Sequence, residues 1–316
     1  MAKPYFKNKI SRAQAVLILL FLGSAILTGA LQYSTPSLRK EDKPYIVVTT
    51  NIIACPLQAI FKGEAVIDTI IPHDTDPHSY TPTLRDNTKL ANADFICAMG
   101  FHFEGGLHTV VENIAMRYPE KTCILSNFLA PSEVKHEVEN PEAANPHYYL
   151  DPTLFEKVVS QACRKFVRKH GLDSAYYEGR LAQYHEEIKE ILQKGKAIIG
   201  QLPEAKRIVC MDHSTFEYAE KPFGFKTYAL KGISMLGEHG LRDREKMTKL
   251  VLENQLSAIF CEVSKNKKSM QAIMDDCAHK KHDIVCKILN TDALQEGQTY
   301  KDLILDNLET IFNALK

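Results

Sequence analysis

Histidine and aspartate side chains follow several of the apolar, β-branched runs in this chain, and these residue types bind metals. His78 lies in the segment after one such run, and His213 comes almost at once after another. His147 lies in the loop after a third run, and Asp292 follows the last one. Three imidazoles and one carboxylate brought together would form a four-coordinate site for a divalent first-row metal.

Each of these residues also has a plainer structural interpretation. A single loop histidine is more often an ordinary surface residue than a ligand, and Asp292 before Ala293 fits a helix N-cap. The candidates are separated by 69, 66 and 79 residues, which is too far for a local motif. The metal-site hypothesis therefore depends on the fold bringing the ends of distant segments together.

Short apolar runs alternate with longer helical patterns along the chain. This alternation predicts buried strands in βαβ units, and hence parallel sheets. Ligands of open parallel sheets bind beyond the carboxyl ends of the strands, which is where the candidates are expected. Four expected strands precede residue 150 and four follow residue 205: 45–50, 65–71, 94–99, 122–125, 207–211, 226–230, 258–263 and 283–289.

One long helical stretch, 174–202, separates the two groups of strands. At roughly 1.5 Å per residue it would pass along a whole domain. Its apolar residues recur at spacings of three and four, which predicts one buried stripe: Tyr177, Leu181, Tyr184, Ile188 and Ile191. The predicted fold class is therefore α/β, with two lobes of mainly parallel sheet and flanking helices joined by a rigid helix. The expected division is 32–172, 173–204 and 205–316.

Charge and motif content exclude several classes of protein. Lys and Arg total 39, as do Asp and Glu, and residues 1–34 hold four basic residues and no acidic one. The remainder is therefore slightly acidic and has no electrostatic footprint for nucleic acid. The phosphate-binding patterns GxGxxG and GxxxxGK[ST], the GxSxG elbow and the HExxH zinc motif do not occur in the sequence.

The N-terminus carries a targeting pattern. Residues 13–31 are uncharged and apolar, and they follow a basic stretch from Lys3 to Arg12. This order is typical of a secretory signal peptide over residues 1–31, and an uncleaved inner-membrane anchor is the alternative. No cysteine precedes Cys55, so the apolar segment is not followed by a lipid-attachment cysteine. We expect the body of the protein in a Gram-negative periplasm.

All eight cysteines lie in this expected exported body. An oxidising compartment permits disulfides, but the sequence does not choose a pairing and contains no CxxC pair. Burial as small hydrophobic side chains is the preferred interpretation for the four that lie in apolar runs: Cys97, Cys210, Cys261 and Cys286.

The segments around the candidate ligands resemble those of a known family, the metal-binding solute-binding proteins of ATP-driven (ABC) importers (ZnuA/TroA-like, solute-binding protein 9 family). The match runs in order over residues 45–316. DPHSYTPTLRDNTKLANADFICAMG (76–100) resembles DPHxYxPTxxDxxxLxxAD, and NPHYYLDP (145–152) resembles DPHxWLDP. Three further segments follow in the family's order: DHSTFEYAEKPFGF (212–225), GISMLGEHGLRDREKM (232–247) and TDALQEGQTYKDLILDNLETI (291–311).

The resemblance implies a function without turnover. A divalent ion is captured between two lobes and delivered to a permease in the inner membrane, which works with a cytoplasmic ATPase. The protein is then not an enzyme, binds no nucleic acid and is expected to be a monomer. The family's metal ligands map onto His78, His147, His213 and Asp292.

The chain departs from the family pattern at several positions. Asn145 replaces the usual Asp and Tyr149 the usual Trp, so the support of His147 is expected to differ. In the fifth segment the usual EPS reads EHG, which introduces His239. None of these changes removes a candidate ligand.

The donor set favours zinc as the bound metal, with manganese or iron as alternatives. Three imidazoles and a carboxylate suit tetrahedral Zn²⁺. Manganese-preferring members of the family tend to have Glu where this chain has His213. Zinc importers often carry a His-rich loop before the second ligand, but here the loop 131–147 is short and acidic.

Two other functions stay open on the sequence. A zinc-dependent hydrolase would need a general base near the metal, for which Glu262 is the candidate. A cell-envelope adhesin or interaction protein would hold a structural metal and keep its N-terminal anchor.

Overall fold

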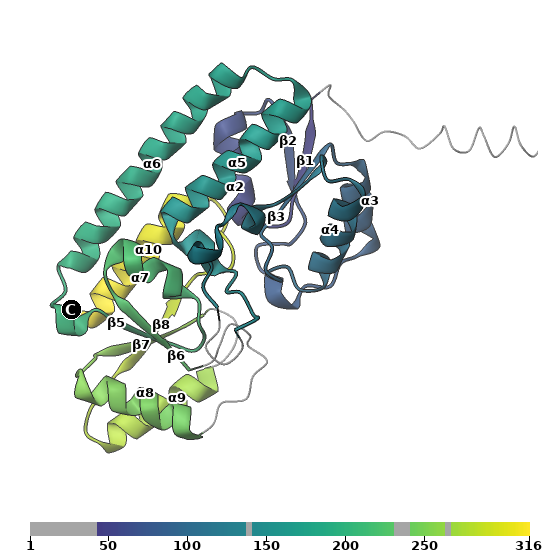
Figure 1. The fold of residues 1–316 in the computed structure, drawn as a ribbon. Helices are drawn as coiled ribbons and strands as arrows, with labels where there is room; N and C mark the ends of the chain where they lie inside the picture. The colour runs from purple at the N-terminus through teal and green to yellow at the C-terminus, as the bar shows by residue number, and fades with distance from the viewer. Residues whose placement is uncertain (1–42, 137–140, 231–240, 263–266) are drawn as a thin grey trace, which may run out of the picture. The chain divides into compact units, whose positions relative to one another are not determined.

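Two four-stranded sheets form the framework of the protein (Figure 1). The computed structural model describes residues 43–136, 141–230, 241–262 and 267–316. The first sheet has the order β2-β1-β3-β4 and the second β6-β5-β7-β8, and neighbouring strands pair in parallel. The predicted α/β class is thereby confirmed. The strands are β1 (Tyr45–Val48), β2 (Val66–Thr69), β3 (Phe95–Ala98), β4 (Thr122–Ile124), β5 (Ile208–Met211), β6 (Lys226–Ala229), β7 (Ala258–Glu262) and β8 (Val285–Leu289).

The expected strands are all present, but the three edge strands β2, β6 and β8 are more exposed than predicted, whereas the fourth edge strand, β4, is mostly buried. The central strands β3 and β7 are buried throughout. Burial on both faces is wrong for β2, β6 and β8, where most side chains are partly or fully exposed. Continuous apolar sequence does not distinguish a central strand from an edge strand, and the helices cover the edges of the sheets less completely.

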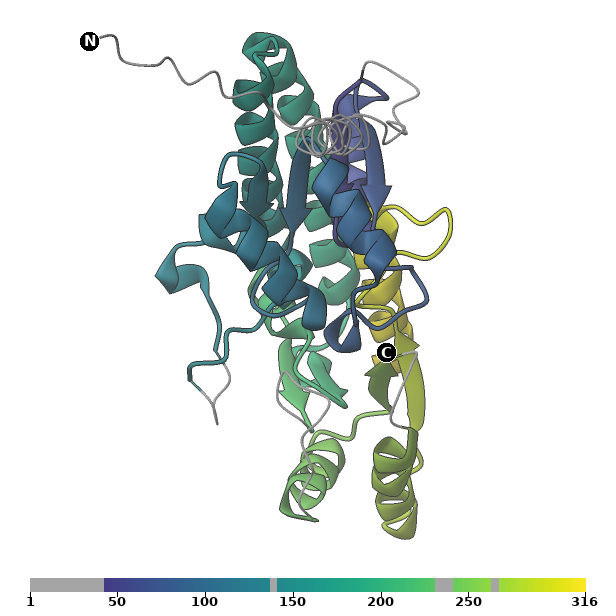
Figure 2. The same cartoon turned by 90° about the vertical axis from the view of Figure 1, so that its right-hand side faces the viewer.

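Helices connect the strands and pack on the sheets (Figures 1 and 2). They are α2 (Asn51–Phe61), α3 (Leu84–Asn92), α4 (Gly106–Arg117), α5 (Pro152–His170), α7 (Glu220–Phe223), α8 (Leu241–Glu253), α9 (Lys267–His279) and α10 (Tyr300–Leu315). Short 3-10 turns lie between them, among them η1 (Pro77–Ser79), η4 (His147–Leu150) and η6 (Phe216–Ala219). Figure 2 shows α8 and α9 at the end of this unit opposite the first sheet.

Residues Pro44–Lys316 form one compact unit. The expected targeting segment 1–31 and His239 lie outside the described residues. Within the described ranges, no helix combines the length and the apolar character needed to cross a bilayer.

The long helix α6 (Ser174–Gly200) links the two lobes, as predicted. It begins at Asp173, whose carboxylate accepts the backbone N–H groups of Ala175 and Tyr176. It packs against α2 and α5, which precede it in the chain, and against α7 and α10, which follow it. The predicted stripe is buried in a hydrophobic core that also contains residues of both sheets: Tyr177, Leu181, Tyr184, Ile188 and Ile191.

The cysteines of the apolar runs are mostly buried, as preferred from the sequence. Cys97, Cys210 and Cys261 are buried in β3, β5 and β7. Cys286 lies in the edge strand β8 and is only partly buried, with its Sγ 3.2 Å from that of Cys261.

Gly195 lies where α6 approaches its neighbours most closely. A Cβ atom at this position would come within 3.0 Å of the buried side chains of Phe223 and Leu308. Gly179 lies on the same helix, but a Cβ there would have nothing within 4 Å. Alanine substitutions at the two positions therefore distinguish the effect of close helix packing from the effect of helix propensity.

Gly195→Ala is expected to lower the free energy of unfolding by about 1–3 kcal/mol, because Phe223 and Leu308 must shift. Gly179→Ala is expected to raise it by about 0.5–1 kcal/mol, because alanine favours the helix and restricts the unfolded chain. Urea denaturation followed by circular dichroism measures both changes. A stabilising effect of Gly195→Ala would show that α6 does not pack as closely as described.

Candidate metal centre

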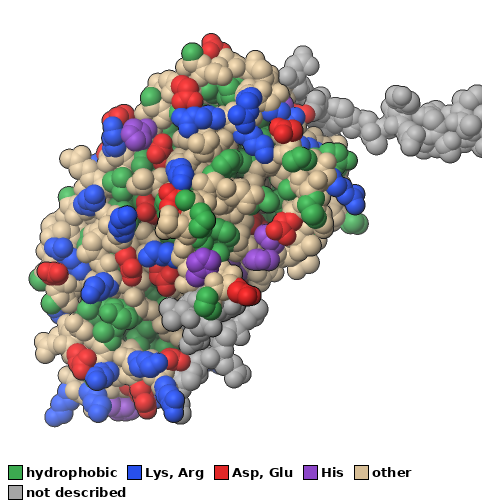
Figure 3. Space-filling view, in the orientation of Figure 1, with side chains coloured by type: hydrophobic (Ala, Val, Ile, Leu, Met, Phe, Trp, Pro, Cys, Tyr) green, Lys and Arg blue, Asp and Glu red, His purple; other side chains and the backbone are tan. Residues whose placement is uncertain are grey.

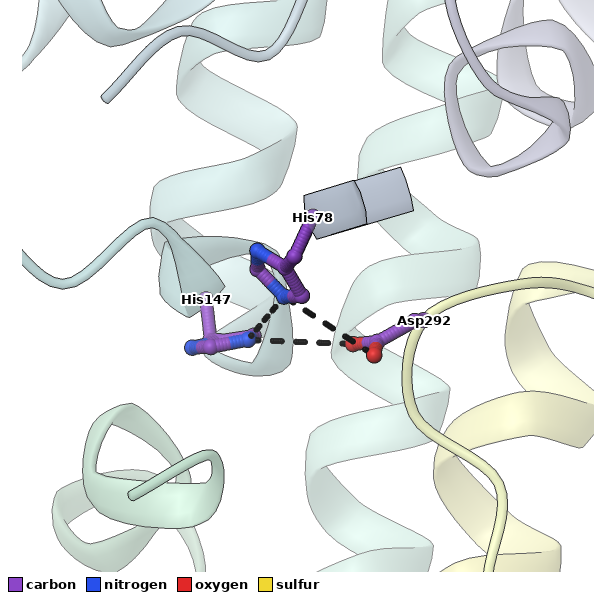
Figure 4. A group of neighbouring side chains, drawn as sticks. All are labelled: His78, His147 and Asp292. Atoms are coloured by element: carbon purple, nitrogen blue, oxygen red, sulfur yellow. Dashed lines mark hydrogen bonds and ion pairs between the residues drawn. The ribbon is translucent and has the colours of Figure 1, made fainter. Parts of the chain in front are cut away.

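Three of the four predicted ligands meet in one cluster (Figure 4). Nε2 of His78 lies 3.2 Å from Nε2 of His147. Asp292 faces both rings, with Oδ2 3.8 Å from Nε2 of His78 and Oδ1 3.7 Å from Nε2 of His147. The donor atoms all lie within 4.8 Å of one another, so one small cation can contact all three side chains.

The fourth predicted ligand, His213, lies beside this cluster and faces Glu262. The ring centroids of His147 and His213 are 5.8 Å apart. Nε2 of His213 lies 3.4 Å from Oε1 of Glu262 and 2.9 Å from Oγ1 of Thr215. His213, Glu262 and Asp292 form a second group of donors within 4.8 Å of one another. Asp292 thus belongs to both groups.

The segment after β2 positions His78 through a short capped turn. Asp76 precedes η1, and its Oδ1 accepts the backbone N–H of His78 at 3.0 Å. Gly105 lies against this turn with φ +50, and a Cβ there would be 2.7 Å from the carbonyl oxygen of His78. Phe103 packs edge-on against the His78 ring, with centroids 5.0 Å apart.

Asn145 holds His147 at the start of η4. Its Oδ1 accepts the backbone N–H of His147 at 3.0 Å and lies 2.8 Å from Nδ1 of the same residue. A donated Nδ1–H leaves Nε2 with a lone pair directed toward His78 and Asp292. The side-chain amide of Asn145 also donates to the carbonyl of Ser214 and to Glu217. It therefore connects His147 to the segment that carries His213.

Tyr149 supports the carboxylate of Asp292. The tyrosine is buried, and its hydroxyl lies 3.2 Å from Oδ1 of Asp292 and 3.3 Å from the carbonyl oxygen of Thr291, within donating distance of either. Asn145 and Tyr149, two of the departures noted from the sequence, therefore both make direct contacts with predicted ligands.

Glu262 is the site residue that the sequence placed least well. The sequence suggests it only as a general base, whereas in the structure it is the last residue of β7 and pairs with His213. Thr215 donates to its Oε1 at 3.1 Å, and Thr291 donates to the same oxygen. These contacts join residues at or just after the ends of β5, β7 and β8. Such contacts between distant segments cannot be predicted from a local sequence pattern.

Not every polar residue of the first loop belongs to the cluster. His73 and Asp74, five and four residues before His78, are exposed and lie outside both donor groups. Asp76 acts as a cap for η1.

Burial makes two of the imidazoles hard to protonate. Burial, and then the neighbouring His78 and His213, hold the pKa of His147 well below its usual value. Burial also lowers the pKa of His78, although the carboxylate of Asp292 opposes the shift. Both rings are therefore neutral near pH 7, which is the form that binds metals.

The pKa of His213 is shifted in the opposite direction. Burial would lower its pKa, but the carboxylates of Glu262, Asp292 and Asp212 outweigh burial and raise the pKa of His213 to about 9. Burial, and then the charge of Asp292, raise the pKa of Glu262 to about 8. Near neutrality this buried pair consequently retains at least one proton.

Three carboxyl groups surround His213, and one of them is unsatisfied. Asp212 is buried with its Oδ1 3.6 Å from Nδ1 of His213, and neither of its oxygens has a hydrogen-bond partner among the described residues. Buried carboxylates are costly unless they are paired or bind a cation. Together with Glu262 and Asp292, these side chains form a donor set that fits a divalent metal. In the metal-free protein, the proton on His213 supplies the positive charge that the metal would otherwise bring.

Comparisons with known proteins agree with this interpretation. A family model described as ZnuA, zinc-uptake complex component A, periplasmic, matches residues 46–314. The manganese-binding lipoprotein MntA of Bacillus subtilis is 24% identical over 310 residues, which cover 96% of this chain and 99% of that protein. The structure of the periplasmic zinc binding protein TroA from Treponema pallidum matches with a TM-score of 0.78 at 24% identity, over 86% of this chain and 99% of that one. Fe(III)-bound YtgA from Chlamydia trachomatis matches with a TM-score of 0.75 at 17% identity, over 87% and 100% of the two chains.

MntA is named as a manganese-binding protein and TroA as a zinc-binding protein, and YtgA is described with Fe(III) bound, so these relatives differ in the metal that they are described with. Members of the family are solute-binding transport proteins and not enzymes, and the hydrolase and adhesin alternatives are not favoured. Because the family model spans nearly the whole of the described unit, the chain belongs to the ZnuA family of metal-binding proteins that serve ABC importers.

Proposed function

We propose that His78, His147, His213 and Asp292 bind the transported ion of this importer component. The meeting of His78, His147 and Asp292 carries the proposal, because their donor atoms lie within 4.8 Å of one another although they come from distant segments. His213 joins them once its proton leaves and its ring turns from Glu262 to the ion. The buried carboxyl groups around His213 supply the negative charge that a divalent cation neutralises.

Zinc is the favoured cargo, with manganese or iron as alternatives. Three imidazoles and one carboxylate match the nitrogen-rich tetrahedral sites that Zn²⁺ prefers. Among divalent first-row ions, a site of this kind binds zinc more tightly than manganese or iron(II). Participation of Glu262 as a further oxygen donor would shift the preference toward manganese or iron.

The protein is proposed to work as a monomer outside the inner membrane, with residues 1–31 as signal peptide or anchor. N-terminal sequencing of the chain recovered from cells distinguishes cleavage from anchoring. The proposed lobes, 32–172 and 205–316, are joined by the connecting segment 173–204. Because α6 packs on both lobes, release to the permease and its ATPase is proposed to use modest lobe and loop shifts.

The first experiment is a metal titration of the purified, metal-free chain with Zn²⁺, Mn²⁺ and Fe²⁺ competed in pairs. One tight ion per chain is expected, with zinc bound most tightly. His78→Ala and Asp292→Ala are each expected to weaken that binding by about a hundredfold or more, because loss of a ligand costs at least as much as loss of its outer support.

His73→Ala is the matched control, since His73 lies in the same loop as His78 but is exposed and outside the cluster. It is expected to leave the affinity unchanged. If His73→Ala and His78→Ala weaken binding equally, or if neither does, the ligand assignment is wrong. Circular dichroism of each metal-free variant confirms that the fold persists.

Metal binding is expected to release about one proton per ion near pH 7, because the raised pKa of His213 keeps that ring protonated in the metal-free protein. The apparent affinity should therefore rise by up to about tenfold per pH unit between about pH 6 and 8. Isothermal titration calorimetry in PIPES and in Tris measures the release from the difference in binding enthalpy. A binding enthalpy that does not depend on the buffer would contradict the predicted protonation.

Tyr149→Phe is expected to weaken metal binding by about tenfold, because the Asp292 carboxylate loses its hydroxyl donor while the packing is kept. The neighbouring Tyr148 is the control: it is also buried, but its hydroxyl donates to the carbonyl of Met99 at 2.9 Å. Tyr148→Phe should therefore lower the thermal midpoint without changing the affinity. Equal affinities for the two variants would exclude a role for Tyr149 at the metal.

A further inference from the structure

The two lobes are also joined beside the metal centre, by contacts that the ligand assignment does not use. The turns η4 and η6, which lie before and after α6 in the chain, pack against each other. His147 is the first residue of η4, and η6 begins at Phe216, three residues after His213. The contact between the two turns therefore involves the segments that carry two of the proposed ligands.

Tyr218 of η6 bridges two backbone groups of the first lobe. Its hydroxyl accepts the backbone N–H of Lys135 at 2.8 Å and donates to the carbonyl of Asn145 at 3.2 Å. Lys135 and Asn145 are themselves paired, because the N–H of Asn145 donates to the carbonyl of Lys135 at 2.8 Å. The tyrosine is buried, so loss of its hydroxyl would leave two backbone groups without this partner at the contact between the lobes.

Glu217 connects the residues next to two proposed ligands. One of its carboxylate oxygens accepts the hydroxyl of Ser214, and the other accepts the side-chain amide of Asn145 at 3.2 Å. Ser214 follows His213 in the chain, and Asn145 holds the backbone and the ring of His147. The carboxylate of Glu217 therefore ties together the two segments that carry these histidines.

Lys135 adds a charged contact to the same turn. Its Nζ donates to the carbonyl of Glu217 at 2.7 Å and lies 3.6 Å from Oε2 of Glu220. The ammonium also lies 5.8 Å from the centre of the Tyr218 ring. Because the Lys135 side chain is 38% exposed, the ion pair itself contributes only a small share of the stabilisation.

We propose that a clasp between the lobes sets how fast the bound ion leaves, and that it consists of Lys135, Asn145, Glu217 and Tyr218. The clasp lies beside His147 and His213, so the segments that carry them separate only when its hydrogen bonds break. Release to the permease through lobe and loop shifts then requires the clasp to open. The inference rests on the proposed function, because it takes both histidines as ligands of the transported ion.

The test is the rate at which Zn²⁺ leaves the purified chain, measured by stopped-flow mixing of the zinc-loaded protein with an excess of a chromogenic chelator. Tyr218→Phe and Glu217→Ala are each expected to raise the dissociation rate constant by about tenfold, because each removes two hydrogen bonds of the clasp. Glu217→Gln should restore a rate near that of the wild-type protein, since an amide accepts from Asn145 and donates to the Ser214 hydroxyl.

Lys135→Ala is expected to raise the dissociation rate constant by about threefold, and Lys157→Ala is its matched control. Lys157 has the same exposure as Lys135, but it pairs with Glu133, which also precedes α6. Figure 3 shows acidic and basic side chains interspersed over one face of the molecule, so the loss of a single positive charge has little effect by itself. Lys157→Ala should therefore leave the rate unchanged.

Three results would each overturn the proposal. They are a wild-type rate for Tyr218→Phe, equal rates for Glu217→Gln and Glu217→Ala with both faster than wild type, and equal effects of Lys135→Ala and Lys157→Ala. Circular dichroism of each metal-free variant confirms that the fold persists.

An equilibrium zinc titration separates failure of the clasp from failure of the ligand assignment. The clasp variants should still bind one ion per chain, with an affinity lowered in proportion to the faster release, whereas His78→Ala should lose the tight binding. If His78→Ala binds zinc as tightly as the wild-type protein, the ligand assignment fails and the clasp fails with it. If His78→Ala loses tight binding but the clasp variants release zinc at the wild-type rate, only the clasp is wrong.

Discussion

The candidate metal centre depends on two separate sheets being held with the carboxyl ends of their strands close together. His78 follows the first sheet's β2, whereas Asp292 follows the second sheet's β8, and their side chains meet at 3.8 Å. The shared core and α6 set this distance, because α6 packs on helices of both lobes. Hydrogen bonds add to it: Asn51 at the start of α2 donates to the carbonyl of Leu294 and accepts its N–H. Each such bond is worth only about 1 kcal/mol, so small rearrangements at the centre remain possible while the framework persists.

The two lobes make chemically different contributions to the centre. The N-terminal segments supply His78 and His147, whose pKa values are lowered by burial. The second sheet supplies the acidic side, with Glu262 and Asp292 around His213. Two neutral imidazoles therefore face a group of carboxyl side chains that keeps at least one proton near neutral pH. An ion bound as proposed would contact both groups, so its binding would be coupled to any relative movement of the two lobes.

Much of this architecture can be predicted from the sequence because it follows from the periodicity of apolar residues. The stripe from Tyr177 to Ile191 and the apolar runs depend on local patterns, and the rule for strand ends indicates where the four candidate ligands lie. The sequence does not reveal contacts made by segments that meet only in the folded chain. The pairing of Glu262 with His213 and the hydrogen bond from Asn145 to Ser214 are of this kind. The exposure of β2, β6 and β8 could not be predicted either, because an apolar run does not indicate whether its strand lies at the centre or at the edge of a sheet.

The replacement of the family's usual Asp by Asn145 has a physical consequence that explains how His147 is held. A carboxylate only accepts hydrogen bonds, whereas an amide both accepts and donates. Asn145 accepts from the backbone N–H of His147 and simultaneously donates to the carbonyl of Ser214, beside His213. An amide at this position also places no negative charge beside the buried His147, where burial lowers the pKa of the ring. The imidazole stays neutral, its Nδ1–H is directed to the amide oxygen at 2.8 Å, and Nε2 keeps its lone pair for the ion.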